Sequence, residues 1–246
     1  MHNTKAKMLI LVEGSRIDIP LMEHLFRLYR IDADYEIVSY DTNIYTLYNQ
    51  MFKDGTPEYM DILQALKERE PDRVKKSIFE QSYTDILLIF DLDPQDPQFT
   101  YKKISEMMDY FVESTDMGKL YINYPMVESF YHMQAIPDTG YNNRTVTLTE
   151  LRNRTYKQRV HNENRNKDYL KFARTLEECT TVINQNIEKG WQILSAKPNE
   201  TLPDNASILN KQLVMLNDHE KIHVLCTCVF FIFEYNPHLL QIHSLS

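Results

Sequence analysis

The chain has 246 residues, of which 43% are hydrophobic and 25% are charged. This length and apolar content allow a full buried core, which excludes a disordered or fibrous protein. No apolar run approaches the roughly 18 residues that a membrane-spanning helix needs, and the first run is too short for the core of a secretory signal. We therefore expect a cytoplasmic protein with no membrane partner, and three cysteines without a paired framework fit a reducing compartment.

The formal net charge of −8 is distributed unevenly along the chain. Between Arg144 and Arg174 there are nine Lys or Arg residues against three Asp or Glu, which gives a local balance of +6. Such a stretch in an acidic protein is typical either of a surface that faces a polyanion or of a solvated helix and loop surface. The residues that we expect to bind nucleic acid are Arg152, Arg154, Lys157, Arg159 and Lys171.

The first half of the chain alternates apolar runs with segments of helical periodicity. Short apolar runs predict strands, and apolar residues at helical spacing predict helices. The predicted strands cover residues 7–12, 35–40, 85–90 and 118–123. The predicted helices follow a cap at Asp18 up to about Tyr29, and cover 44–52, 59–68, the region 104–111 and a segment that opens at Pro125. This alternation predicts an α/β fold with a central, mainly parallel sheet.

The second half of the chain is predicted to be mostly helical. A basic, Asn-rich stretch follows Tyr141 and predicts a loop or insertion that leads into a helix over about 168–188. Two more segments follow at 208–216 and 221–235, and the second is apolar enough to be buried in the core or against a partner protein. We therefore expect a catalytic domain at 1–140 and a basic insertion with a helical C-terminal extension at 141–246.

Three acids stand where two of the predicted strands end. Glu13 and Gly14 follow the first strand, and Asp91 and Asp93 follow the strand at 85–90. Ligands of parallel sheets bind at the carboxyl ends of the strands. Two aspartates at i, i+2 point to the same side if the backbone stays extended, and their repulsion favours a bound divalent cation. Oxygen ligands select Mg²⁺ or Mn²⁺, which support phosphodiester cleavage.

The strings ILVEGSRID and LLIFDLDPQD resemble the two halves of the Toprim signature. This signature is shared by primases, topoisomerases, the OLD (overcoming lysogenization defect) nucleases and a ribosomal-RNA maturation nuclease. The resemblance covers about Lys7 to Ala135, and the invariant positions fall on Glu13, Gly14, Asp91 and Asp93. It implies a Rossmann-like fold with one or two Mg²⁺ or Mn²⁺ ions at the carboxylate triad.

Two further segments are similar to the RloB-like group of Toprim proteins. Asp18 lies five positions after the triad glutamate, as in that group, and YPMVESFYHM resembles a segment that places Glu128 on a family glutamate and His132 near a family histidine. The match is loose, because Tyr124 replaces an Asn and Ser129 stands where a large apolar residue is usual. The resemblance implies a relative of antiphage effectors, including PARIS-type systems that work beside an ABC-type ATPase.

The resemblance also implies a second metal and a lysine near the scissile phosphate. Asp18 and Glu128 are the expected ligands of the second metal, although each residue type also caps helices. Lys167 is the expected catalytic lysine, with Lys171 and Lys157 behind it, and each of these also suits a phosphate contact or a solvated position.

These features together predict a metal-dependent Toprim endonuclease. Its substrate is expected to be RNA such as tRNA, or DNA, and its role to be an effector in antiphage defence. The alternative is a non-catalytic Toprim subunit that docks onto a partner ATPase or a sensor, and assembly of several copies of the chain stays open. A haloacid-dehalogenase-type phosphotransferase fits less well, because Gln95 stands where that family has Thr or Val.

Overall fold

The structure is a computed structural model that describes residues 6–53, 56–57, 61–115, 117–198 and 201–240. The chain forms two compact units. The first unit is Met1–Phe90 with Gln98–Tyr121, and the second is Asp91–Pro97 with Ile122–Ser246. The expected boundary at residue 140 lies inside the second unit. The reason is that Tyr124 pairs with Leu225 through two backbone hydrogen bonds of 2.8 and 2.9 Å, which joins the segment before 140 to the last third of the chain.

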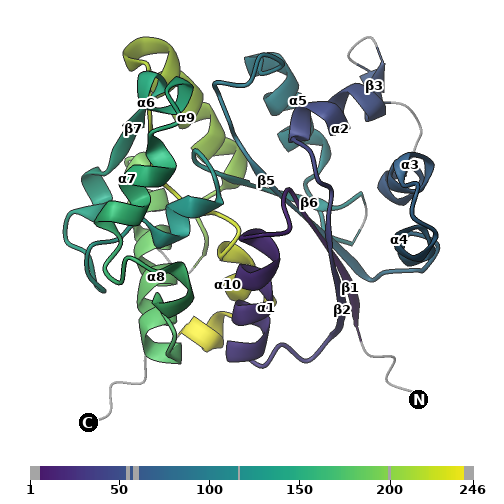
Figure 1. Cartoon of the computed structure of the whole chain (residues 1–246), viewed down its shortest axis with the longest axis horizontal. Helices are drawn as coiled ribbons and strands as arrows, with labels where there is room; N and C mark the ends of the chain where they lie inside the picture. Colours follow the sequence, from purple (N-terminus) through teal and green to yellow (C-terminus); the bar gives the residue numbers. More distant parts are fainter. Residues whose placement is uncertain (1–5, 54–55, 58–60, 116, 199–200, 241–246) are drawn as a thin grey trace. The chain divides into compact units, whose positions relative to one another are not determined.

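The main sheet has four strands in the order β2-β1-β5-β6 (Figure 1). β1 pairs in parallel with β2 on one side and with β5 on the other. The apolar runs of β1 and β5 are almost completely buried, as expected for parallel strands that are covered on both faces. The α/β class is therefore confirmed. The strand bounds are Lys7–Val12 for β1, Asp34–Ser39 for β2, Asp85–Asp91 for β5 and Lys119–Asn123 for β6.

Five helices and two short strands complete the described part of the first unit. They are α1 (Asp18–Leu28), α2 (Ile44–Met51), β3 (Phe52–Lys53), β4 (Thr56–Pro57), α3 (Ile62–Arg69), α4 (Arg73–Ile78) and α5 (Tyr101–Tyr110). The helix predicted over 59–68 begins at Ile62, where Asp61 caps it, and residues 58–60 lie outside the described part. Helix α4 was missed because none of its residues is buried, which leaves no apolar periodicity to detect.

The second unit contains the helical C-terminal part, which is also confirmed. Its antiparallel strands β7 and β8 pair Val146 with Ile222. No helix in the described part of the chain has the length and apolar content to cross a membrane. The elements are η1 (Val127–Tyr131), η2 (Tyr141–Asn143), β7 (Thr145–Thr147), α6 (Leu148–Arg152), α7 (Tyr156–Glu163), η3 (Tyr169–Lys171), α8 (Leu176–Ile193), α9 (Asn205–His219), β8 (Lys221–His223), α10 (Phe230–Tyr235) and η4 (Pro237–Leu240).

The elements of the second unit differ from the predicted ones in three places. The helix predicted over 168–188 is divided into η3 and α8, because Ala173 takes a left-handed φ of 49° between them. The stretch predicted as a loop or insertion contains helix α7, and helix α6, which a capping box of Thr147 and Glu150 begins, precedes it. The helix expected after Pro125 is the short 3-10 helix η1. The apolar segment 221–235 is largely buried, as predicted, and contains β8 and α10.

Candidate functional site

Asp91 ends β5 and belongs to the second unit, where a backbone N–H group binds its carboxylate. The Asp91 side chain is buried, and its Oδ1 accepts a hydrogen bond of 2.9 Å from the Val127 N–H. The segment after β5 also runs beside the end of β6, because the Leu92 N–H donates a hydrogen bond of 3.0 Å to the carbonyl of Asn123, the last residue of β6. These bonds hold the Asp91 carboxylate at the start of η1, one residue before Glu128.

Asp93 lies on the turn that leaves β5. Its φ of 39° is left-handed, so the extended backbone on which the i, i+2 argument for the two aspartates depended does not continue through this residue. Burial raises the pKa of Asp93, while a 2.9 Å hydrogen bond from Gln95 and the charge of Lys157 act in the opposite direction. The charges of Glu128 and Asp96 raise this pKa further. Asp93 therefore shares its electrostatic environment with Glu128 and Lys157.

Glu128 and Lys157 form an ion pair beside these aspartates. Glu128 lies in η1, is 1% exposed and makes no capping hydrogen bond. Its Oε1 is 2.7 Å from Nζ of Lys157, whereas its Oε2 is buried with no hydrogen-bonding partner in the described part of the chain. Burial would lower the pKa of Lys157, but the charges of Glu128, Asp91 and Asp93 outweigh it and raise this pKa. The charges of the nearby acids thus keep this lysine positively charged.

Helix α7, which carries Lys157, is held at both ends by His132. The His132 ring is fully buried, with Nε2 2.8 Å from Oε2 of Glu163 and Nδ1 3.2 Å from the Tyr156 hydroxyl. Burial lowers the pKa of His132 to about 4, although the Glu163 carboxylate acts in the opposite direction. A neutral ring fits both contacts, since Nε2–H donates to Glu163 and Nδ1 accepts from Tyr156. Tyr156 is therefore a structural residue.

The buried His132 predicts a loss of stability in acid. An unfolded histidine has a pKa near 6.5, whereas that of His132 is about 4, so the unfolded state binds more protons between these values. The free energy of unfolding should fall by about 3 kcal/mol from this group as the pH drops from 6.5 to 4. Urea unfolding at several pH values measures this loss. Burial also lowers the pKa of His223 to about 4, so this residue adds to the loss of stability in acid.

The comparison of variants isolates the contribution of His132. His132→Gln should reduce the acid-dependent loss, and His161→Gln, at an exposed position of α7, should leave it unchanged. An equal loss of stability in wild type and in His132→Gln would show that this ring already carries its proton in the folded protein.

The structure places Lys157, and not Lys167, beside the acids of the second unit. Lys167 is exposed, has a left-handed φ of 51° and uses its N–H to bond the Asn164 carbonyl. No interaction in the described part of the chain joins it to Asp91, Asp93 or Glu128. Sequence reasoning ranked Lys157 third because residues 157 and 128 come together only through the packing of α7 on η1.

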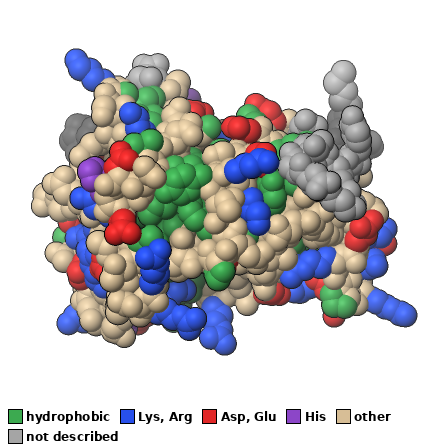
Figure 2. Space-filling view, turned by 90° about the horizontal axis from the view of Figure 1, so that it is seen from above, with side chains coloured by type: hydrophobic (Ala, Val, Ile, Leu, Met, Phe, Trp, Pro, Cys, Tyr) green, Lys and Arg blue, Asp and Glu red, His purple; other side chains and the backbone are tan. Residues whose placement is uncertain are grey.

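Ion pairs neutralise much of the basic stretch. Arg159 lies 2.9 Å from Glu150 and 3.0 Å from Glu163, and Lys171 lies 3.6 Å from Asp168. On the face shown in Figure 2, Lys and Arg side chains are likewise interspersed with Asp and Glu. Arg152 and Arg154 are exposed and form no ion pair in the described ranges. These two arginines are thus more available to a polyanion than Arg159 or Lys171.

Glu13 and Asp18 lie in the first unit, at the two ends of the turn between β1 and α1. The Glu13 N–H donates to the Ile89 carbonyl over 3.0 Å, which continues the pairing of β1 with β5. The prediction that Asp18 caps α1 was wrong: Ile17 is the cap residue and Asp18 is the first residue of the helix. Asp18 is buried, and its Oδ2 lies 3.4 Å from where a Cβ on Gly14 would stand. Its carboxylate therefore lies against the turn that follows Glu13.

Within the described residues, no group of three or more His, Cys, Asp or Glu is arranged to hold a metal ion. Comparisons with models of protein families, with curated proteins and with solved structures found no match to this chain.

Proposed function

We propose that the protein is a metal-dependent nuclease that hydrolyses phosphodiester bonds. The observation that carries this proposal is the buried carboxylate of Glu128, which faces Lys157 with one oxygen and has no hydrogen-bonding partner for the other in the described part of the chain. A buried polar atom without a partner costs about 1–3 kcal/mol, and such sites in native proteins often serve a ligand. The nearby Asp91 and Asp93 add further carboxylates to the same environment.

The chemistry of the donors supports Mg²⁺ or Mn²⁺ as the cofactor. Asp91, Asp93 and Glu128 offer only carboxylate oxygens, which hard divalent cations prefer. We include Glu13 and Asp18 as further ligands because the sequence pattern predicts them. The strand order also reverses between β1 and β5, and α/β sheets bind ligands at the carboxyl ends of strands at such a reversal. When bound, the metal would neutralise charge on the phosphate and acidify a water molecule.

Lys157 has the properties of a phosphate-binding group. Its side chain is 64% exposed, so a substrate can reach it, and the surrounding acids keep it protonated. An ammonium group binds a phosphate oxygen as a point charge. In the proposed reaction Lys157 leaves Glu128 for a non-bridging oxygen of the substrate, and His132 positions it by holding both ends of α7.

The resemblance to RloB-like proteins supports the biological part of the proposal. It favours a cytoplasmic antiphage effector that cleaves RNA such as tRNA, or DNA, beside an ABC-type ATPase. A non-catalytic Toprim subunit is the second candidate. It is favoured by the Glu128–Lys157 pair, because a lysine that already neutralises the acid removes part of the need for a cation.

A cleavage assay distinguishes the two candidates. The protein, alone and with its ATPase partner, is incubated with mixed tRNA, plasmid and single-stranded DNA in Mg²⁺ or Mn²⁺. We expect cleavage that a chelator abolishes, that Asp91→Asn and Glu13→Ala lose, and that Asp109→Asn on the exposed face of α5 retains. If nothing is cut, or if Asp91→Asn cuts like wild type, the nuclease proposal fails.

A further inference from the structure

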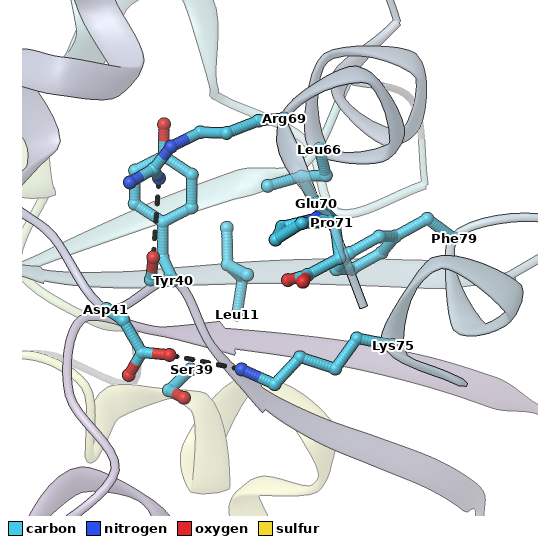
Figure 3. A pocket seen from close by; sticks show the side chains of 10 residues that line it. All are labelled: Leu11, Ser39, Tyr40, Asp41, Leu66, Arg69, Glu70, Pro71, Lys75 and Phe79. Carbon is cyan, nitrogen blue, oxygen red and sulfur yellow. Dashed lines mark hydrogen bonds and ion pairs between the residues drawn. The ribbon is translucent and has the colours of Figure 1, made fainter. Parts of the chain in front are cut away.

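A cavity of about 260 Å³ lies in the first unit, where β2 ends (Figure 3). Its apolar lining comes from four side chains, Leu11, Leu66, Pro71 and Phe79. The volume is close to the lower limit of small-molecule sites, which is roughly 300 Å³. The cavity therefore has room for about one base, and the rest of a larger ligand would lie at its open side.

One wall of the cavity is a cation stacked on an aromatic ring. The guanidinium carbon of Arg69 lies 4.2 Å from the centre of the Tyr40 ring, and Nη1 donates to the Tyr40 carbonyl over 3.3 Å (Figure 3). A guanidinium has five N–H donors, and besides the bond to the Tyr40 carbonyl this group also contacts the Tyr40 hydroxyl. Stacking on Tyr40 holds the planar guanidinium group in one orientation, so its other N–H groups are pre-organised to bind an anion.

The lining also carries one ammonium group and two carboxylates. Lys75 lies 3.1 Å from Asp41, and Oε1 of Glu70 accepts the Asp72 N–H over 2.9 Å. Arg69 makes no direct ion pair with a carboxylate of the described chain, although its charge lowers the pKa of the nearby Asp41. The Lys75–Asp41 pair is partly exposed, and such pairs contribute little, so Lys75 can change partner at small cost.

The cavity adjoins the turn that carries Glu13. Asp41 has a left-handed φ of 57°, which is unfavourable for a residue other than glycine, and its N–H donates to the Glu13 carbonyl over 3.0 Å. Strained residues of this kind concentrate at ligand sites. A ligand in the cavity would therefore lie beside the end of β1, which also bears a predicted metal ligand.

We infer that this cavity binds one nucleotide unit, with the base on the apolar lining next to Tyr40 and the phosphate on Arg69 and Lys75. A plain anion would not need the apolar lining, and a purely apolar ligand would make no use of the Arg69 guanidinium and the Lys75 ammonium group. A free mononucleotide and a nucleotide within a strand offer the same chemistry. In the second case the cavity holds the substrate strand next to the Glu13 turn, and this case rests on the proposed nuclease function.

Binding without cleavage tests the inference. Calorimetric titrations of the full chain in EDTA use AMP, GMP, inorganic phosphate, and ten-nucleotide single strands of RNA and DNA. We expect Arg69→Ala to weaken nucleotide binding at least 10-fold and Arg69→Lys to weaken it less. Lys75→Ala should weaken it several-fold and reduce its dependence on salt. The matched control is Lys76→Ala, the next residue of α4, which does not line the cavity and should bind like wild type.

The outcomes separate the sources of the ligand. Binding of AMP or GMP that Arg69→Ala loses supports a free nucleotide, and binding of single strands alone supports a substrate strand. Inorganic phosphate that binds as tightly as AMP overturns the inference, as does the absence of any binding or an Arg69→Ala variant that binds normally. Asp91→Asn should bind like wild type, so loss of cleavage with retained binding would test the nuclease proposal separately from the cavity.

Discussion

Replacing Glu128 with glutamine should reduce metal-dependent cleavage by about 100-fold or more while leaving the fold intact. Removal of one carboxylate weakens the charge stabilisation that the proposed metal site offers to the transition state. Loss of one charge-stabilising group in an active site typically lowers the rate by about 100-fold or more. Glutamine keeps the shape of the side chain but removes a buried negative charge that has Lys157 as its ion-pair partner. Initial cleavage rates and the thermal unfolding midpoint of the same preparations measure the two effects.

The midpoint is informative because the acids repel one another. Without its charge, position 128 no longer adds to the repulsion that raises the pKa of Asp93, so the midpoint should stay unchanged or rise. Glu188→Gln, on the exposed side of α8, is the matched control and should change neither quantity. Cleavage that stays within twofold of wild type in Glu128→Gln would remove this residue from the proposed site.

Replacing Arg144 with methionine should lower the free energy of unfolding by about 3–5 kcal/mol, the usual cost of removing one partner from a buried ion pair. Nη1 of Arg144 lies 2.7 Å from Oδ2 of Asp138 and also donates to the His132 carbonyl over 2.7 Å. The two side chains are only 7% and 6% exposed. The substitution leaves a buried carboxylate and a buried carbonyl without this donor. Urea unfolding at pH 7 measures the change.

A double variant identifies the cause of this destabilisation. Two backbone N–H groups, of Gln134 and Gly140, also donate to Asp138, and with Arg144 they hold its pKa below the ordinary value despite burial. Combining Arg144→Met with Asp138→Asn removes the uncompensated charge, so the double variant should lose less stability than the two single variants added together. Strict additivity would contradict the pairing, and the exposed Arg152→Met should stay within about 0.5 kcal/mol of wild type.

The strands and the acids that end them followed directly from the sequence. Continuous apolar runs specified β1 and β5, because parallel strands buried on both faces leave no position for polar residues. Helix α5 followed from apolar residues at helical spacing. Asp91 could be named as a candidate site residue for the same reason, since it stands where a buried strand must end. These features depend on residues that are neighbours along the chain.

The partners of those acids depend on residues that are distant along the chain. Glu128 and Lys157 are joined by the packing of α7 on η1, which His132 fixes through Tyr156 and Glu163. Helix α7 has only two buried residues and therefore too weak an apolar pattern to predict. Basic composition alone could not show that Arg159 forms ion pairs with two neighbouring carboxylates, whereas Lys157 forms one with Glu128.

The sequence by itself determined the α/β class, the main strands and the positions of the acids, because burial and periodicity are local properties of the chain. Only the tertiary structure decided which lysine stands beside Glu128, that Asp18 lies against the Glu13 turn, and that Arg69 stacks on Tyr40 in a cavity. Each of these contacts joins side chains on different elements or in a turn. Local residue propensities do not determine the geometry of such a turn. The distances of these contacts follow from how the elements pack, which sequence spacing does not determine.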